Sequence, residues 1–287
     1  MKKFKIKSYC KVNLYLKVGR KLNNGYHNIA SLISFCDIYD LITISQIKGL
    51  KDKITFSGKF KKGINLKKNT VTRLFYLLRK KKLLVNTVFK INIKKNIPHS
   101  SGLGGGSSNA ADLLNFLNKK KNLELNKKDT FKLANKIGFD TPICLEKKNT
   151  FLNGKKNKIS RFNKKLNLFL IIIYPNISCS TKKIYEKNKK ISLTNVSSFP
   201  NFSSRKKLIF FLKDESNDLE KAVIKIYPKI GKIIRKIKSF KGCHFSRVTG
   251  TGSACIGIFS NEKNAKYAKK MIKLKYPKYW CVASKTV

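Results

Sequence analysis

The chain has 287 residues, of which 41% are hydrophobic, and a formal net charge of +51 at pH 7. This length fits two modest domains better than one compact core, and no apolar run reaches the roughly 18 to 20 residues of a membrane-spanning helix. Only seven of the 65 basic residues are arginine, the residue that best reads phosphates and bases, so the charge indicates a compositional bias and no specific nucleic-acid site.

Location and redox state follow from two further patterns. Lys11 and Lys17 interrupt the apolar residues behind the N-terminal lysines, which argues against a signal peptide and favours the cytoplasm. The seven cysteines are odd in number and never spaced as CxxC, so neither a disulfide framework nor a zinc ribbon is expected. Nothing in the sequence indicates the oligomeric state.

The N-terminal half alternates between strand and helix patterns. Residues 4–18 alternate apolar and polar side chains at period two, and Asn24-Gly25 then predicts a tight turn. Further strands are expected over residues 32–45, 53–58 and 87–98, and a helix over 69–84. In the last of these strands Phe89, Ile91 and Ile93 share one face, which predicts a sheet covered on that side.

The C-terminal half continues this mixture. Helices are expected from residue 107, over 127–138 with Gly138 as C-cap, over 217–240 with a break near Pro228, and over 261–275. Strands are expected over residues 150–160, 166–175 and near 249–259. Residues 188–207 are polar and rich in Ser, Asn and Lys, which predicts a linker or long surface loop. The fold class is therefore α+β.

The most informative stretch is PHSSGLGGGSSNAADLL, residues 98–114. It contains no lysine, and Ser107 occupies the third glycine position of GxGxxG, so it fits neither of the two common phosphate-binding fingerprints. Gly102 and residues 104–106 nevertheless allow positive φ angles, which turn successive amides toward one anion. Ser107 and Ser108 then begin a helix whose N-terminal amides favour a polyphosphate, and their hydroxyls suit a phosphate-bound Mg²⁺. The alternative is a tight loop with no ligand.

The same stretch resembles the second motif of the GHMP superfamily of small-molecule kinases. One of its families, the 4-diphosphocytidyl-2-C-methyl-D-erythritol kinases, has an N-terminal sequence that two further stretches resemble, KVNLYLKV and NNGYHNIASLISFCDIYDLITI. GFDTPICL, ESNDLE and RVTGTGSACIGIF resemble later motifs of that family, in the same order. The resemblance runs from residue 11 to residue 259 and so covers nearly the whole chain.

This resemblance implies a two-domain fold, a reaction and a co-substrate. Residues 1–157 would form a ribosomal-protein-S5-like domain that carries the ATP-binding glycine loop, and residues 158–287 a ferredoxin-like domain. The implied enzyme is an ATP-dependent phosphotransferase of isoprenoid and terpenoid precursor synthesis by the non-mevalonate route. It would phosphorylate the 2-hydroxyl of 4-diphosphocytidyl-2-C-methyl-D-erythritol, with Mg²⁺ accompanying ATP and with no dedicated metal ligands in the protein.

The resemblance also assigns site residues. The catalytic lysine falls on Lys11 and the catalytic aspartate on Asp140, whose carboxylate would accept the hydroxyl proton. The cofactor-binding residues would be Pro98, His99, Ser100, Ser101, Gly102, Leu103, Gly104, Gly105, Gly106, Ser107, Ser108, Lys95 and Asn69. The substrate-binding residues would be Asn13, Tyr26, His27, Thr181 and Tyr185.

Several residues have a plainer interpretation. Lys11 is one of many lysines, Asp140 could cap the segment that follows it, and Tyr185 could be a core residue rather than a base-stacking one. The segment His99-Ser100-Ser101 departs from the family, which usually has small residues such as Gly-Ala there, and Ser and His tolerate positive φ less well than Gly. His99 is expected to face solvent or to contact a phosphate.

Two alternative functions remain open at the level of sequence. One is another GHMP kinase, acting on a mevalonate-type or homoserine-type alcohol. The other is a non-catalytic basic module that binds RNA. The interpretation as a 4-diphosphocytidyl-2-C-methyl-D-erythritol kinase leaves a small-molecule substrate and ATP as the only expected partners, with no membrane and no specific nucleic acid.

Overall fold

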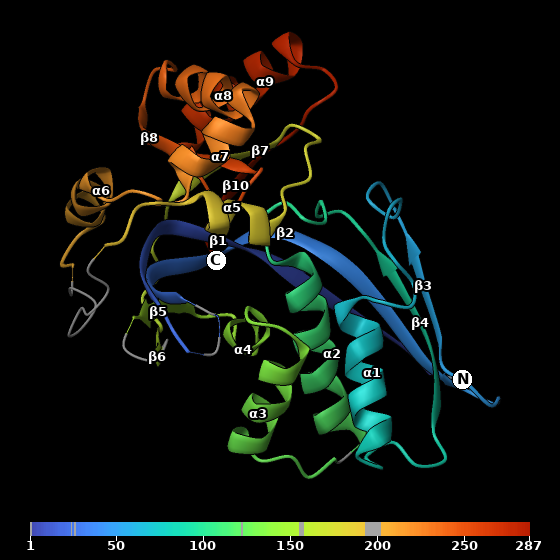
Figure 1. The fold of residues 1–287 in the computed structure, drawn as a ribbon. Helices are drawn as coiled ribbons and strands as arrows, with labels where there is room; N and C mark the ends of the chain where they lie inside the picture. Colours follow the sequence, from blue (N-terminus) through green and yellow to red (C-terminus); the bar gives the residue numbers. More distant parts are fainter. Residues whose placement is uncertain (1, 24, 26, 122, 155–157, 193–201) are drawn as a thin grey trace. The chain divides into compact units, whose positions relative to one another are not determined.

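The chain folds into two compact units, each assembled from segments that lie far apart in the sequence (Figure 1). This computed structural model describes all residues except 1, 24, 26, 122, 155–157 and 193–201. The first unit comprises residues 1–10, 38–99 and 104–147, and the second comprises residues 11–37, 100–103 and 148–287. The long strands β1 (Lys3–Lys21) and β2 (His27–Ile47) contribute residues to both. The division expected between residues 157 and 158 stays a prediction.

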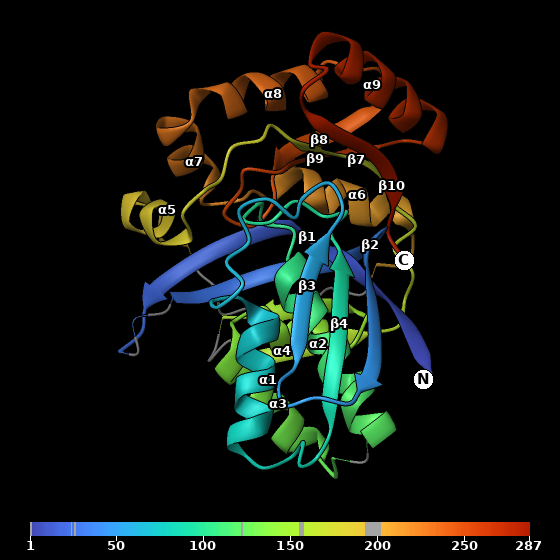
Figure 2. The same cartoon turned by 90° about the vertical axis from the view of Figure 1, so that its right-hand side faces the viewer.

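Helices cover one face of a small sheet in the first unit (Figure 2). Residues 41–47 of β2 pair antiparallel with β4, which pairs in parallel with β3. The elements are β3 (Lys53–Ser57), α1 (Thr70–Lys80), β4 (Val88–Lys94), α2 (Gly105–Lys121), α3 (Lys127–Ile137) and the short α4 (Thr141–Cys144). Phe89, Ile91 and Ile93 are buried against the helices, which confirms the face predicted from their spacing.

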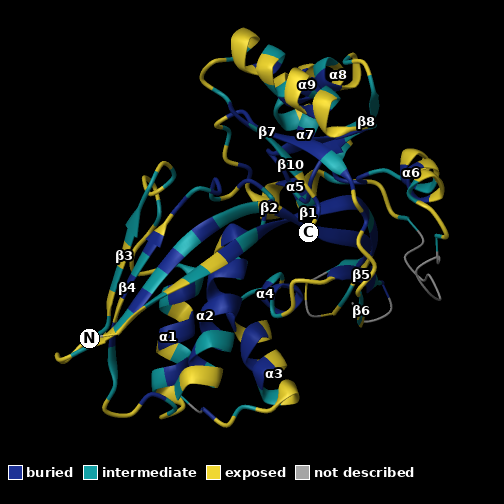
Figure 3. Ribbon diagram, turned by 180° about the vertical axis from the view of Figure 1, so that it is seen from behind, coloured by how far each residue is buried: buried dark blue, intermediate teal, exposed yellow. Residues whose placement is uncertain are grey.

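Helix α2 is the central element of this core. Ala110, Leu113, Leu114 and Leu117 are fully buried, as their helical spacing predicts, and Figure 3 shows the helix as buried over much of its length. Helix α3 ends where the glycine signal places its C-cap, with the Gly138 amide donating to the Ala134 carbonyl at 3.2 Å. The N-terminus of α2 is thereby held on a well-packed base.

The second unit contains a four-stranded antiparallel sheet in the order β10-β7-β9-β8. Helices α8 and α9 pack against this sheet. The remaining strands β5 and β6 form a hairpin, and β5 also pairs with residues 31–33 of β2. The bounds are β5 (Asn149–Asn153), β6 (Lys158–Phe162), β7 (Phe169–Tyr174), α5 (Thr181–Lys187), α6 (Arg205–Asp214), α7 (Glu220–Ile226), α8 (Pro228–Lys238), β8 (Cys243–Val248), β9 (Cys255–Phe259), α9 (Glu262–Lys275) and β10 (Trp280–Lys285).

The observed boundaries correct the expectations in two places and confirm them in a third. Helix α2 begins at Gly105, two residues before the predicted start, because the glycines themselves adopt the first helical turn. The predicted linker 188–207 extends too far, since α6 already begins at Arg205, while residues 193–201 lie outside the described part. The break near Pro228 is confirmed, because α7 ends at Ile226 and the proline begins α8.

Two further features concern the thiols and the lengths of the helices. All seven cysteines fall within the described residues, and none of them forms a disulfide. Burial raises the pKa of Cys179 and of Cys243 to about 11 and that of Cys281 to about 12, so these thiols stay protonated at neutral pH. In the part of the chain that the structure describes, no helix combines the length and apolarity needed to span a membrane.

The packing of α2 predicts a large cost for truncating its core face. Leu114→Ala should lower the free energy of unfolding by about 2–5 kcal/mol, because the lost contacts leave a cavity. The control Leu50→Ala removes a side chain that is 99% exposed and should change it by less than about 0.5 kcal/mol. Urea unfolding of both variants measures the difference, and equal midpoints would contradict the assigned packing.

Candidate active site

The first part of the glycine loop belongs to the second unit, where it packs against residues 249–254. The Ala254 amide donates to the Ser101 carbonyl at 3.0 Å. Gly102 has φ +82°, and a Cβ atom there would lie 2.3 Å from the Thr249 carbonyl oxygen. Only glycine satisfies both the left-handed backbone and this close approach.

Lys11 is held in the same unit by its own backbone and by Asn13. The Lys11 amide donates to the Leu103 carbonyl at 3.0 Å, and its ammonium donates to Asn13 Oδ1 at 2.8 Å. The Asn13 amide donates to Thr249 Oγ1 at 2.8 Å, and Asn13 Nδ2 donates to Ser31 Oγ at 2.9 Å. Lys11 is only 4% exposed, so this lysine differs from the many solvated ones.

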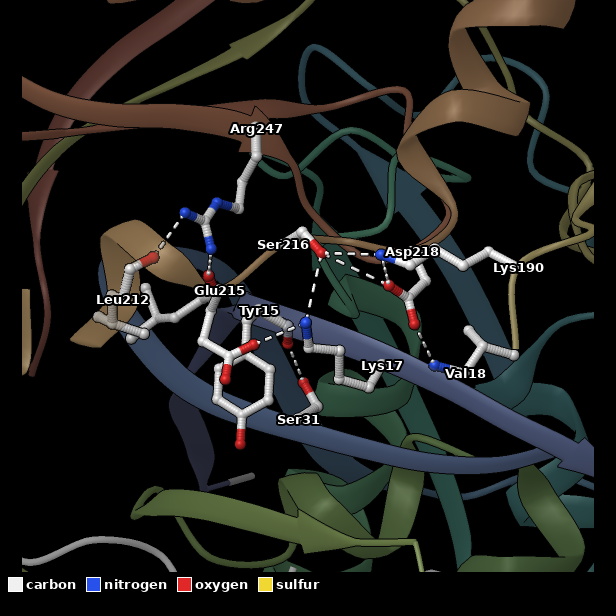
Figure 4. Close-up of polar contacts among 11 residues, drawn as sticks. Tyr15, Lys17, Val18, Ser31, Lys190, Leu212, Glu215, Ser216, Asp218 and Arg247 are labelled. Atoms are coloured by element: carbon white, nitrogen blue, oxygen red, sulfur yellow. Dashed lines mark hydrogen bonds and ion pairs between the residues drawn. The ribbon is translucent and has the colours of Figure 1, made fainter. Parts of the chain in front are cut away.

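The segment ESNDLE, residues 215–220, anchors β1 beyond Lys11 (Figure 4). Asp218 accepts the Val18 amide at 2.8 Å and pairs with Lys190 at 2.7 Å. Asn217 Nδ2 donates to the carbonyls of Val248 and Gly250 at 2.9 and 2.8 Å. This segment therefore fixes both the lysine-bearing strand and the loop that receives Gly102.

Arg247 adds a buried brace next to this segment (Figure 4). Its guanidinium donates to the Leu14 carbonyl at 2.9 Å and to the Leu212 carbonyl at 2.7 Å. Burial lowers the pKa of Arg247 to about 10, while Glu220 and Glu215 oppose the shift. The group stays charged at neutral pH, and it connects β8 to β1 and α6.

The predicted substrate residues form two contacts in the second unit. His27 and Tyr185 stack with ring centroids 5.0 Å apart and an interplanar angle of 25°. Burial, assisted by Lys21, lowers the pKa of His27, so its imidazole is neutral at pH 7. Thr181 Oγ1 lies 3.2 Å from Thr251 Oγ1. Tyr26, predicted beside His27, lies outside the described residues.

The second part of the glycine loop, from Gly104, lies in the first unit and begins α2. The first hydrogen bond of this helix runs from the Ser108 amide to the Gly104 carbonyl at 2.9 Å. The amides of Gly105, Gly106 and Ser107 therefore have no acceptor within the helix. Free amides at the positive end of a helix dipole favour an anion.

The two serines at the start of α2 differ in their surroundings. Ser108 is buried, and its hydroxyl donates to Cys144 Sγ at 3.3 Å, so it supports α4. Ser107 is partly exposed. Of the two hydroxyls that the sequence suggested for a cation, the Ser107 hydroxyl is the accessible one. Thr70 also braces this turn, with its hydroxyl donating to the Gly106 carbonyl at 2.7 Å.

The unusual segment before the first glycine has a definite conformation. His99 Nε2 donates to the Lys62 carbonyl at 2.9 Å, so the ring has a protein partner. Ser100 adopts φ +51°, the left-handed region that glycine would occupy at no cost. Ser101 is buried and Pro98 precedes the turn. The departure from small residues is accommodated by backbone strain at one serine.

Lys95 and Asn69, both predicted to bind the cofactor, have structural partners. Asn69 is the N-cap of α1, and its Oδ1 accepts the amides of Val71 and Thr72 at 3.0 and 2.9 Å. Lys95 is buried, and its ammonium pairs with Asp40 and donates to Asn109 Oδ1 at 3.0 Å. Nucleotide contacts from these two residues stay predictions.

Asp140 lies at the start of α4 and is partly exposed. The alternative that it caps this helix is wrong. Its φ and ψ of −80° and −13° are helical rather than extended, and its side chain makes no capping hydrogen bond to α4. Capping therefore does not account for an aspartate at this position.

Four supporting residues were not singled out by the sequence: Asp40, Thr70, Asn217 and Thr249. Asn217 and Thr249 lie within two of the motifs that carry the family resemblance, ESNDLE and RVTGTGSACIGIF, so the sequence could have indicated their supporting role. Asp40 interrupts an apolar strand pattern and is one of only eight aspartates. A carboxylate buried in such a strand requires a partner, but the sequence does not say which residue that partner is.

Comparison with known proteins identifies the family. Residues 69–148 match GHMP kinases N terminal domain, and residues 199–278 match GHMP kinases C terminal. A protein of Pelagibacter ubique (strain HTCC1062) named 4-diphosphocytidyl-2-C-methyl-D-erythritol kinase is 39% identical over 287 residues, with 100% of each chain covered. The chain belongs to the GHMP kinase family, in its 4-diphosphocytidyl-2-C-methyl-D-erythritol kinase branch.

Further relatives support this placement. A protein of the same name from Anaplasma phagocytophilum (strain HZ) is 30% identical over 294 residues, covering 100% of this chain and 96% of its own. The crystal structure of a 4-(cytidine 5'-diphospho)-2C-methyl-D-erythritol kinase has a TM-score of 0.77 at 20% identity, covering 98% and 99% of the two chains. A homoserine kinase from Cytophaga hutchinsonii has a TM-score of 0.73 at 14% identity, covering 100% and 95%. At these identities the structures show the fold alone.

Membership confirms the expected GHMP kinase fold with its mixed α+β content. This chain is accordingly an ATP-dependent small-molecule kinase, with ATP as co-substrate. The reading as a non-catalytic RNA-binding module is not favoured by these relatives.

The close approach at Gly102 predicts a stability difference between two glycines of equal φ. Gly102 and Gly25 both have φ +82°, but a Cβ at Gly25 would meet nothing within 4 Å. Gly25→Ala should cost only the left-handed strain of about 1–2 kcal/mol, whereas Gly102→Ala should cost more because its Cβ strikes backbone. Thermal unfolding compares the two, and equal shifts would contradict the packing of the loop on Thr249.

Proposed function

We propose that this kinase transfers the γ-phosphoryl group of ATP to the 2-hydroxyl of 4-diphosphocytidyl-2-C-methyl-D-erythritol, a step of non-mevalonate isoprenoid precursor synthesis. The observation that carries the proposal is the 39% identity, over the full length of both chains, to a protein named for this activity. Features of the two units, each taken by itself, support the proposal.

The phosphates of ATP are assigned to the N-terminus of α2. The amides of residues 105–107 have no acceptor within the helix, and they point a partial positive charge out of its first turn. Gly106 is exposed and carries no side chain of its own, so ligand atoms can approach its amide. Uncharged amides can bind a polyphosphate in this way without the lysine of other phosphate loops.

Asp140 is assigned as the proton acceptor and Lys11 as the source of positive charge. A hydroxyl that attacks phosphorus must lose its proton, and a carboxylate is a suitable acceptor. Asp140 is partly exposed and is not used as a helix cap. The Lys11 ammonium is buried and oriented by Asn13, so it is held in one place, as a group that stabilises developing charge must be.

The cytidine end of the substrate is assigned to the rings of His27 and Tyr185, with Tyr26, Thr181 and Asn13 as further binding residues. A neutral imidazole stacked on a phenol ring offers both an aromatic face and a hydrogen-bonding edge, which a pyrimidine base requires. Thr181 adds a hydroxyl close to Thr251 in the third motif.

Mg²⁺ is proposed to accompany ATP. Among the described residues no group of three or more His, Cys, Asp or Glu side chains is arranged to hold a metal. The available oxygen ligands, such as the Ser107 hydroxyl, fit a cation that is bound mainly by phosphate oxygens. When bound, Mg²⁺ would neutralise phosphate charge during the transfer.

The first test of this proposal removes the proton acceptor. Asp140→Asn should lower kcat by about 10²–10⁴-fold, since an amide cannot accept the proton. The Kd for ATP should be unchanged, because the α2 amides remain. A coupled ATPase assay with the cytidine diphosphate substrate and a calorimetric titration with ATP measure the two quantities.

The matched control is Asp214→Asn, which changes an exposed aspartate at the end of α6 and should leave kcat unchanged. Full turnover by Asp140→Asn would contradict the assigned role. The same assay, run with mevalonate and homoserine, examines the substrate. Turnover with mevalonate or homoserine alone would contradict the proposed alcohol.

A second prediction concerns the base-stacking ring. Tyr185→Ala should raise the KM for the cytidine diphosphate substrate about tenfold or more, because stacking on a base contributes about 1–3 kcal/mol. The KM for ATP should stay unchanged. Tyr76→Ala, which removes a ring that is 61% exposed on α1, serves as the control. An unchanged KM for the alcohol would show that Tyr185 does not contact the base.

A further inference from the structure

A buried ion pair lies behind the glycine loop in the first unit. The Lys95 ammonium pairs with an Asp40 carboxylate oxygen, and the two side chains are 3% and 0% exposed. Burying two charges is costly unless each is paired and hydrogen-bonded. The surrounding bonds show how this pair meets that requirement.

Asp40 fixes the segment that leads into the loop. Its Oδ1 accepts the amides of Asn96 and Ile97 at 2.8 and 2.9 Å. Asn96 Nδ2 donates in turn to the Tyr39 carbonyl at 2.9 Å. The residues just before Pro98 are therefore bound to β2 through one carboxylate.

The same pair also holds the helix that follows the loop. Asn109, in the second turn of α2, accepts from Lys95 Nζ at 3.0 Å and donates to Asp40 Oδ2 at 3.1 Å. A Cβ at Gly105 would lie 3.4 Å from Lys95 Nζ and 3.0 Å from Ile97 Cγ2. The first turn of α2 thus lies directly against the cluster Asp40, Lys95 and Asn109.

We propose that Asp40 is a positioning residue for ATP, which fixes the start of α2 relative to the segment before the glycine loop. The inference rests on the proposed function, because it takes the α2 amides as the phosphate-binding groups. Amides bind a phosphate well only when their directions are set before the ligand arrives. Asp40 sets them through Asn96 and Ile97 on one side and Asn109 on the other.

Lys95 contributes to the same positioning of α2. Its ammonium is engaged by Asp40 and Asn109 beneath the helix, so it acts on the nucleotide through the position of α2. Burial lowers the pKa of Lys95 and Asp40 opposes that shift, so the charge on the lysine depends on its partner. Removing the Asp40 charge would leave a buried cation unpaired.

The chain offers a matched control at the opposite end of β4. Asp52 pairs with Arg79 at 2.8 Å and accepts the Phe89 amide at 2.9 Å. Like Asp40, it binds one cation and a backbone amide of the β4 region, but these partners, Arg79 and Phe89, belong to neither the glycine loop nor α2. Loss of its charge should affect the stability of the first unit without moving the α2 amides.

The experiment compares Asp40→Asn, Asn109→Ala and Asp52→Asn in the full-length chain. The readouts are the Kd for ATP by titration calorimetry, the KM values for both substrates and the thermal unfolding midpoint. Asp40→Asn and Asn109→Ala should raise the Kd and KM for ATP about tenfold, equivalent to about 1.4 kcal/mol, with the KM for the alcohol unchanged. Asp52→Asn should lower the unfolding midpoint and leave the Kd for ATP unchanged.

Asn109→Ala keeps the ion pair intact, so it reports on positioning even if Asp40→Asn fails to fold. Wild-type affinity for ATP in Asn109→Ala, or equal ATP affinities of Asp40→Asn and Asp52→Asn, would overturn the inference alone. Failure of the wild-type chain to bind ATP would overturn the proposed function together with it.

Discussion

The structure depends on one constraint: the first amides of α2 have no acceptor within the helix, while one face of the helix is buried in the core of the first unit. A helix N-terminus carries unsatisfied donors, and most proteins cap them with a side chain. In this chain α1 and α3 are capped by Asn69 and Asn126, whereas α2 begins with glycines that offer no such side chain. The short helices α4 and α7 and the proline-initiated α8 also lack a side-chain cap, but α2 is the helix whose motif resembles a phosphate-binding loop.

Glycine supplies the freedom for such a turn but no rigidity, so rigidity must come from its neighbours. Two separate devices provide it. In the second unit Gly102 lies against Thr249, and Asn217 binds the carbonyls on either side of that threonine. In the first unit Asp40 accepts a hydrogen bond from Asn96, before the glycines, and another from Asn109, in the helix after them. The loop is flexible in composition but is held by buried polar bonds at both of its ends.

Local patterns predicted the elements that such patterns control. The alternation of apolar and polar residues over 87–98 predicted a strand, and the helical spacing of apolar residues after Gly106 predicted α2. Both patterns arise because one face of the element is buried. Helix α6 was not predicted, because its buried residues Leu208, Ile209 and Leu212 follow a polar, lysine-rich segment whose composition is typical of a loop. Asn69 follows a local rule as well, since an asparagine directly before a helix is a typical N-cap.

The supporting cluster could not be predicted, because its partners are distant in sequence. Asp40 and Lys95 are 55 residues apart, and no sequence pattern around either residue indicates that the two side chains form a pair. Among so many lysines, the informative ones are those that the fold buries. Counted as whole residues, Lys11 and Lys95 are 4% and 2% exposed, and the ammonium of each donates to oxygen acceptors that fix its position. Burying a charged group costs free energy that only pairing and hydrogen bonds offset, and both of these buried lysines lie beside a segment of the glycine loop.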